Sequence, residues 1–166
     1  MDDATAAIDV ESIKRLKARY CRHLDAKDWG AWRELFADDF VCEIAGASGR
    51  GVAGADEFVS YTRTTLGRRW QSTVHHVHAP EISLTSPTTA RGVWALNDVV
   101  RLLPALTLHG YGHYRETYEK ADGQWRFTSL QLTRLREDIV TPLLTLPNAR
   151  RLRVAAARLA RRLGER

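Results

Sequence analysis

Residues 108–136 read LHGYGHYRETYEKADGQWRFTSLQLTRLR, and this stretch decides the fold class. Its two halves are rich in β-branched and aromatic residues, which is typical of β-strands. Between them, Ala121-Asp122-Gly123 predicts a hairpin turn, because an Asp-Gly pair tolerates the positive φ angles that such turns require. We therefore expect Leu108–Glu119 and Gln124 to about Arg136 to pair as long antiparallel strands.

Two further long strands are expected upstream of this hairpin, at Thr73–Leu84 and Ala90–Leu103. Ser86-Pro87 and the region around Pro104 are the breaks between the strands. Four long strands joined by short turns predict a strongly curved antiparallel (mixed) sheet.

Three helices are expected before these strands. The first runs from about Ile8 to Leu24, with apolar residues recurring every three or four positions at Ile13, Leu16, Tyr20 and Leu24. Asp28 is the expected N-cap of a short second helix, whose apolar side would consist of Trp29, Trp32, Leu35 and Phe36. The third is expected at Asp56 to about Leu66, after a short strand at Phe40–Ile44 and a glycine-rich loop at Ala45–Gly54. Helices first and strands afterwards indicate an α+β domain.

The positive charge of the chain is concentrated in its last residues. The 166 residues carry a formal net charge of +5, but Ala149–Arg166 alone holds seven arginines and one glutamate, a net +6. The other 148 residues carry 18 basic and 19 acidic side chains, so they lack the basic footprint of a nucleic-acid-binding domain. Ala149–Leu163 has the pattern of a helix, for which packing against the body or a partner subunit is the first interpretation. Contact with an anionic membrane surface or with nucleic acid is the alternative.

Composition also bears on where the protein works. No apolar run approaches the roughly 18 residues of a membrane-spanning helix. The acidic start of the chain has no apolar signal core, so a cytoplasmic protein is expected. Cys21 and Cys42 are isolated, and we expect two free thiols rather than a disulfide.

The order of these elements resembles the SnoaL-like branch of the nuclear transport factor 2 superfamily. The similarity extends from about Ile8 to Glu137. It rests on short segments in a matching order: 19–25 (RYCRHLD), 28–29 (DW), 35–39 (LFADD), 74–76 (VHH), 112–114 (GHY) and 122–126 (DGQWR). This resemblance implies a cone-shaped α+β barrel at residues 1–140, with three N-terminal helices on a curved sheet around an apolar pocket. Residues 141–166 would form an arginine-rich, helical C-terminal extension.

Within that superfamily, the pattern is similar to cofactor-independent eliminating enzymes such as scytalone dehydratase, bile-acid 7α-dehydratase and hexachlorocyclohexane dehydrochlorinase. The resemblance implies that Asp25, at the end of the first helix, pairs with His75, at the start of a strand. It also implies a catalytic role for Tyr20, five residues before the aspartate. The plain structural alternatives are a helix-end carboxylate for Asp25 and core packing for Tyr20.

Substrate contacts are implied in the same way. Asp98 matches an acidic residue of the bile-acid enzyme, and a charged residue in an otherwise apolar strand needs a partner or water. A late arginine of that enzyme is matched by either Arg134 or Arg136, depending on where the last strand bulges. Four aromatic residues would line the pocket or belong to the core: Trp29, Tyr61, Trp94 and Tyr114.

The chemistry of an Asp–His pair suits proton transfer near neutral pH. A neutral imidazole accepts a proton, and a carboxylate on its other nitrogen fixes the tautomer and stabilises the imidazolium. Such a base can take a proton from a carbon beside a carbonyl and hand it to a departing hydroxyl. Tyr20 would donate a hydrogen bond to the carbonyl oxygen. These considerations predict a dehydratase-type lyase or an isomerase acting on a hydrophobic, polycyclic or phenolic molecule, without a metal or organic cofactor.

Other interpretations remain open. A polyketide or terpenoid cyclase, or a ketosteroid-isomerase-like enzyme, would use the same pair, and a non-catalytic ligand-binding or interaction module would use none of it. A homodimer or homotrimer is expected from the relatives. His76 and His78 share one strand face and would bind a metal only with a third ligand, which we do not find, because Glu81 is expected on the face of His75.

Overall fold

The computed structural model describes residues 2–44 and 51–146. Three helices precede the long strands, as expected. The helices are α1 (Asp3–Ala26), α2 (Trp29–Arg33) and α3 (Ala55–Leu66). The strands are β1 (Phe36–Ile44), β2 (Gly51–Ala53), β3 (Thr73–Leu84), β4 (Thr89–Leu103), β5 (Leu106–Ala121), β6 (Gln124–Val140) and β7 (Thr145–Leu146).

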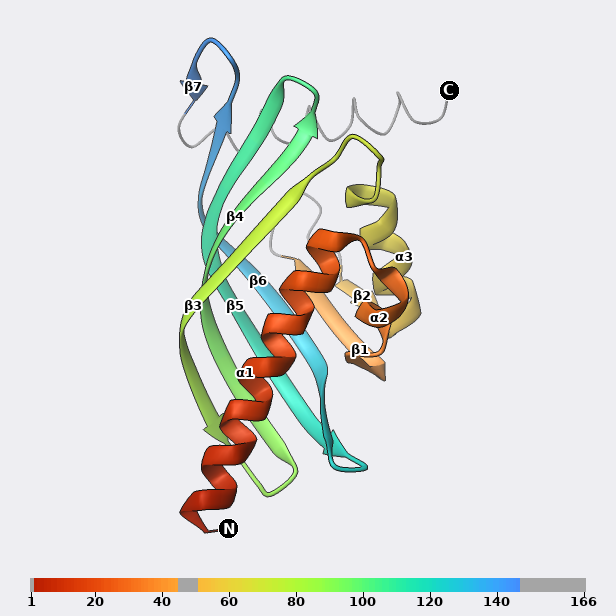
Figure 1. The fold of residues 1–166 in the computed structure, drawn as a ribbon, viewed down its shortest axis with the longest axis vertical. Coiled ribbons are helices and arrows are strands. Elements are labelled where there is room, and N and C mark those ends of the chain that lie inside the picture. Colours follow the sequence, from red (N-terminus) through yellow and green to blue (C-terminus); the bar gives the residue numbers. More distant parts are fainter. Residues whose placement is uncertain (1, 45–50, 147–166) are drawn as a thin grey trace.

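The strands form one mixed, strongly curved sheet. Its order is β2-β1-β6-β5-β4-β3, with β7 added beside β6. The four long strands pair antiparallel, as expected, whereas β1 lies parallel to β6. Figure 1 shows α1 lying across one face of this sheet, with α2 and α3 beside β1 and β2. We call the face covered by α1 the inner face and the opposite face the outer face.

Helix α1 buries the apolar stripe that its spacing predicts: Ile13, Leu16, Tyr20 and Leu24 are all buried. It begins earlier than expected, at Asp3, because the carboxylate of Asp2 caps it by accepting a hydrogen bond from the backbone N–H of Thr5 at 2.7 Å. Asp28 caps α2 in the same way, through the backbone N–H of Ala31 at 3.2 Å. Both caps are aspartates, and the preference for aspartate at a helix N-cap depends only on the backbone of the next few residues.

The second helix is shorter than predicted. It ends at Arg33, and Phe36 already belongs to β1, so placing Leu35 and Phe36 on the helix was wrong. The reason is non-local, because the carbonyl of Leu35 accepts a hydrogen bond from the backbone N–H of Phe127 at 3.0 Å. Pairing with β6 therefore draws this segment into the sheet, where Phe36 packs edge-on against Trp32.

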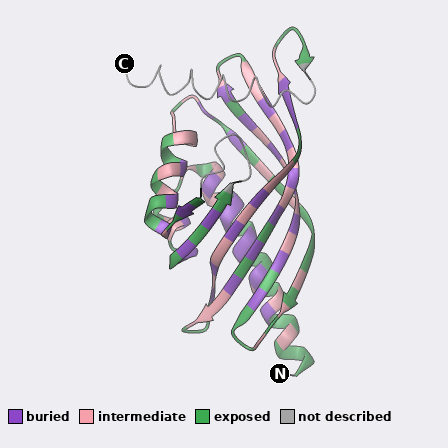
Figure 2. Ribbon diagram, turned by 180° about the vertical axis from the view of Figure 1, so that it is seen from behind, coloured by how far each residue is buried: buried purple, intermediate pink, exposed green. Residues whose placement is uncertain are grey.

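Buried and more exposed residues alternate along the long strands (Figure 2), and bulges reverse the alternation of side chains between the two sheet faces at defined points. In β3 the register shifts between His78 and Glu81, where Ala79 has φ 47°. As a result, Glu81 is exposed beside Ser83 on the outer face, and its predicted place on the face of His75 was wrong. In the described part of the chain, no three His, Cys, Asp or Glu side chains are grouped to hold a metal ion.

The hairpin that suggested the fold forms as predicted. Asp122 and Gly123 have φ angles of 51° and 74°, the left-handed values of a tight hairpin turn. Strand β6 continues to Val140, beyond the expected end. The helix predicted at Ala149–Leu163 lies outside the described residues.

Both cysteines are free and buried. Burial raises the pKa of Cys21 to about 11 and that of Cys42 to about 12. None of the helices within residues 2–44 and 51–146 combines the length and apolar character needed to cross a membrane.

Candidate active site

Asp25 and His75 contact each other at one end of the inner face. The last turn of α1 brings the Asp25 carboxylate against β3, where Oδ1 lies 2.7 Å from Nδ1 of His75. The other oxygen, Oδ2, accepts a hydrogen bond from the backbone N–H of His75 at 2.8 Å. These two contacts hold the carboxylate and the imidazole in a fixed relative orientation, although the residues are 50 positions apart.

The charge on Asp25 decides which nitrogen of the His75 imidazole carries the proton. Burial by itself would raise the pKa of Asp25, but the hydrogen bonds from His75 and Thr73 outweigh it and hold that pKa below its ordinary value. An ionised carboxylate only accepts hydrogen bonds, so Nδ1 of His75 carries the proton. In the neutral imidazole the lone pair is therefore on Nε2, which can act as a base.

Nε2 of His75 faces a second carboxylate. The register of β3 and β4 places His75 directly opposite Asp98, and Nε2 lies 3.9 Å from Oδ2 of Asp98. Arg134 binds both oxygens of Asp98 through two parallel hydrogen bonds of 2.6 Å. Burial alone would lower the pKa of Arg134, but its bonds to Asp98 raise it, so the guanidinium stays charged.

A glycine makes room for this ion pair. Gly110 lies opposite Asp98 in the neighbouring strand β5. A Cβ at residue 110 would sit 2.2 Å from Oδ1 of Asp98 and 2.3 Å from a terminal nitrogen of Arg134. Our sequence analysis missed this role, although a glycine inside a strand pattern often marks a close approach.

A bulge decides which of the two late arginines reaches the site. Gly112 pairs with Arg134 and Tyr111 with Arg136, so Leu135 is the extra residue of the bulge. Arg134 consequently lies on the inner face and Arg136 on the outer face. Arg136 binds the carboxylate of Asp138 at 2.8–2.9 Å, and its predicted place in the pocket was wrong.

Tyr20 is buried deeper in the cone. Its ring packs against Trp32, Phe36, Tyr114 and Phe127 at centroid distances of 5.3–6.1 Å. The hydroxyl forms no hydrogen bond with the residues described in the structure. Burial raises the pKa of Tyr20, so the hydroxyl stays neutral and can only donate or accept hydrogen bonds.

The four candidate aromatic residues have different surroundings. Trp94 belongs to the core, where its indole N–H donates to the hydroxyl of Tyr118 at 2.9 Å. It lies four residues before Asp98 on β4, about 13 Å along the strand, so it is not brought to the Asp–His pair. Burial raises the pKa of Tyr114, and the nearby charge of Asp98 adds to this effect. Trp29 and Tyr61 are partly buried against the helical side of the core.

Several buried ionic residues were absent from our predictions, and two of them form a pair beneath Tyr20 and Tyr114. The side chains of Lys17 and Glu116 are fully buried and form an ion pair with each other. The Lys17 ammonium also lies 3.7 Å from the ring centroid of Tyr114 and 4.2 Å from that of Tyr20. The sequence clue to the burial of Lys17 was its position on the apolar stripe of α1, three residues before Tyr20.

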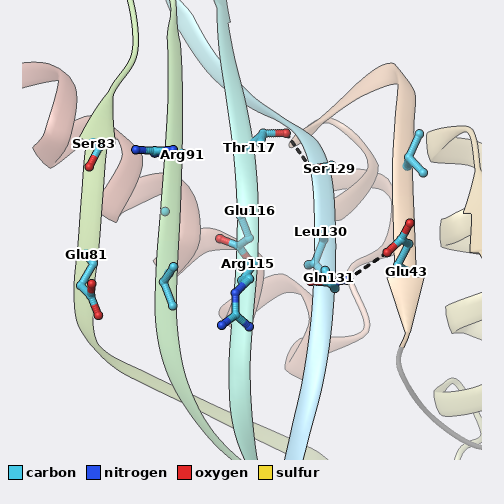
Figure 3. A pocket seen from close by; sticks show the side chains of 13 residues that line it. Glu43, Glu81, Ser83, Arg91, Arg115, Glu116, Thr117, Ser129, Leu130 and Gln131 are labelled. Atoms are coloured by element: carbon cyan, nitrogen blue, oxygen red, sulfur yellow. Dashed lines mark hydrogen bonds between the residues drawn. The ribbon is translucent and has the colours of Figure 1, made fainter.

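A prominent pocket of the protein lies away from the Asp25–His75 pair. It measures about 640 Å³ and lies over the outer face of the sheet (Figure 3). Charged and hydroxyl side chains line it, among them Glu43, Glu81, Ser83, Arg91, Arg115 and Thr117. The Asp–His pair is on the opposite face, so this hollow is not the predicted apolar pocket.

Comparison with known proteins places this arrangement in a family. The model of the SnoaL-like domain matches residues 5–131. A protein of Gibberella zeae named "Probable cyclase FGR4" is 24% identical over 136 residues, which cover 74% of this chain and 89% of that protein.

Solved structures agree with this match. A "Putative Scytalone Dehydratase" from Novosphingobium aromaticivorans superposes with a TM-score of 0.74 at 26% identity, covering 82% of this chain and 90% of that chain. Hexachlorocyclohexane dehydrochlorinase LinA-type3 from Novosphingobium barchaimii has a TM-score of 0.75 at 16% identity, covering 85% and 96% respectively, which shows the shared fold alone. The resemblance inferred from the sequence is thus confirmed, and the chain belongs to the SnoaL-like domain family of the nuclear transport factor 2-like superfamily.

Proposed function

We propose that this protein is a cofactor-independent lyase that removes water from a hydrophobic, polycyclic or phenolic molecule. The observation that most directly supports this proposal is the 2.7 Å contact between Asp25 and Nδ1 of His75, which leaves Nε2 of the neutral imidazole available as a base. This nitrogen is aimed at a second, arginine-bound carboxylate rather than at solvent. A base held between two carboxylates in a buried site is well placed to move a proton between substrate atoms.

The reaction can proceed through one histidine. Nε2 of His75 takes a proton from a carbon next to a carbonyl, and the electron pair of that C–H bond forms a C=C double bond. The neighbouring C–O bond breaks, and the imidazolium returns the proton to the departing hydroxyl, which leaves as water. Asp25 stabilises the imidazolium while it exists, because its carboxylate already faces Nδ1.

The other residues have supporting roles in this proposal. The Tyr20 hydroxyl donates a hydrogen bond to the carbonyl oxygen as negative charge develops there. Asp98 accepts a hydrogen bond from a substrate hydroxyl, and the two bonds from Arg134 hold its carboxyl group in a fixed orientation. Tyr114 borders this region, whereas Trp94 is assigned to the core.

One relative supports elimination by its name, the "Putative Scytalone Dehydratase" that is 26% identical to this chain. The relative named as a probable cyclase favours a second candidate, a cyclisation. Both begin with the same step, removal of a proton from an activated carbon by His75. They differ in whether the resulting electron pair expels a leaving group or attacks a carbon in the same molecule.

The test is turnover on a panel of polycyclic ketones and phenols that carry a hydroxyl β to a carbonyl. Mass spectrometry distinguishes dehydration, which loses a water, from cyclisation without such a loss. We expect His75→Ala and Asp25→Asn to reduce the rate by about 10²–10⁴-fold, the usual contribution of general acid–base catalysis. His76→Ala is the matched control, because this neighbouring histidine is exposed on the outer face. Turnover by His75→Ala at the rate of the unsubstituted protein would refute the proposal, and ligand binding without conversion would favour a binding module.

A further inference from the structure

The residue that ends α1 is conformationally unusual. Lys27 is the C-cap of the helix and has φ 61° and ψ 28°, the left-handed conformation. Helices that end this way usually have glycine there, because a Cβ clashes with the backbone in this region. The chain therefore has a lysine where glycine would fit without strain.

That side chain turns back toward the candidate active site. Its ammonium donates a hydrogen bond to the hydroxyl oxygen of Thr73 at 2.7 Å. The same hydroxyl donates its proton to Oδ1 of Asp25 at 2.8 Å. Because a threonine hydroxyl has one proton, the bond received from Lys27 directs that proton to Asp25. These two linked hydrogen bonds lead to Oδ1 of Asp25, the oxygen that also faces Nδ1 of His75.

We propose that Lys27 is a positioning residue for the Asp25–His75 pair and acts through the hydroxyl of Thr73. The inference rests on the function proposed above for that pair. Asp25 accepts three hydrogen bonds, from the Thr73 hydroxyl and from the backbone and ring nitrogens of His75. Without Lys27 the Thr73 hydroxyl is free to rotate away, and the carboxylate loses one of the groups that hold it against the imidazole.

The charges around the pair give Lys27 a second effect. Asp98 faces the imidazole from β4, and Arg134 of β6 binds Asp98 and lies 3.6 Å from the buried carboxylate of Glu137. Lys27 adds a positive charge on the Asp25 side. Burial lowers the pKa of Lys27, while the charge of Asp25 acts to raise it. The interaction is reciprocal, so the ammonium favours the ionised form of Asp25.

The substitutions separate backbone strain from the side chain. Lys27→Gly removes both the strain and the ammonium, whereas Lys27→Met removes the ammonium and keeps the strain. Thr73→Val breaks the connection in the middle, and Thr73→Ser preserves it. Lys14→Met is the matched control, since this exposed lysine of α1 pairs only with Glu11. Each variant is made in the full chain and followed by thermal unfolding and by the carboxyl ¹³C shift of Asp25 as pH is lowered.

We expect Lys27→Gly to unfold at or above the temperature of the unsubstituted protein and Lys27→Met to unfold below Lys27→Gly. Both should raise the pKa of Asp25 by about 0.5 to 1, the size expected for losing one charge at this range, and Thr73→Val should raise it because the carboxylate loses a hydrogen bond. On a substrate found as above, kcat should fall by about tenfold with little change in KM. Thr73→Ser and Lys14→Met should leave the pKa of Asp25 unchanged.

An Asp25 titration that is unchanged in Lys27→Gly and Lys27→Met would overturn this inference and leave Lys27 a structural cap. The titration needs no substrate, so it fails or succeeds independently of the proposed function. A fully active His75→Ala variant would instead refute the proposed function and with it the role of Lys27 in turnover.

Discussion

Gly110→Ala is the substitution through which the geometry of the site can be tested most directly. The added methyl carbon would lie 2.2 Å from Asp98, 2.3 Å from a terminal nitrogen of Arg134 and 2.9 Å from its Cζ. Non-bonded heavy atoms do not approach this closely, so one partner of the ion pair must move. Asp98 is 1% exposed and the Arg134 side chain is 11% exposed, so a separated partner would remain mostly buried.

The expected cost follows from what is separated. Breaking a buried ion pair costs about 3–5 kcal/mol when a charge is left without its partner. The substitution gains about 0.4–1 kcal/mol because alanine restricts the unfolded chain more than glycine does. Partial relaxation of the long Arg134 side chain reduces the penalty further. We therefore expect a net loss of about 2–4 kcal/mol in the free energy of unfolding, together with a marked loss of turnover.

Urea denaturation gives the free energy of unfolding. Gly30→Ala is the matched control, because no atom lies within 4 Å of a Cβ at this position of α2. It should stabilise the protein by about 0.5–1 kcal/mol, the usual gain of alanine over glycine inside a helix. A double-mutant cycle adds a second check: in a chain carrying Asp98→Asn and Arg134→Met, Gly110→Ala should cost much less. If Gly110→Ala were as stable and as active as the unsubstituted protein, the argument that this glycine accommodates the ion pair would be refuted.

Three further outcomes are expected. The folded-state pKa of Asp25 lies below its ordinary value of 3.8. The ionised carboxylate therefore stabilises the folded protein above pH 3.8, and this stabilisation is lost as the pH falls through the folded-state pKa. The difference in free energy of unfolding between the unsubstituted protein and Asp25→Asn, measured by urea denaturation, should accordingly narrow below pH 3.8. Lys17→Met should destabilise by about 3–5 kcal/mol, because it leaves Glu116 charged and buried, and adding Glu116→Gln should recover most of the loss in the same assay. Iodoacetamide at pH 8 should label neither Cys21 nor Cys42 in the native protein but both in urea, as counted by mass spectrometry, and native labelling would contradict their burial and raised pKa values.

The secondary structure could be predicted where its causes are local. The α1 stripe follows from spacing along one helix, and Asp28 caps α2 through its own backbone neighbours. The Asp122-Gly123 turn is set by the φ angles that these two residues tolerate. The prediction failed at Leu35 and Phe36, where helical spacing continued but a hydrogen bond to β6 decided the conformation.

The site was predictable in part. The contact between Asp25 and His75 was expected from family resemblance, and the structure contains it. The choice between Arg134 and Arg136 was not predictable, because a bulge reverses the face of every later residue and its position depends on the partner strand. The same effect misplaced Glu81 in β3.

Periodicity, capping and turn residues are properties of short segments, so the sequence by itself determined the helices, the long strands and the α+β class. The tertiary structure alone decided which side chains meet. The Lys27–Thr73–Asp25 connection joins residues nearly 50 positions apart, and the pairing of Lys17 with Glu116 spans 99. Such contacts depend on sheet register and on the path of α1 across the inner face, because hydrogen bonds and ion pairs act over a few ångströms in space and are independent of separation along the chain.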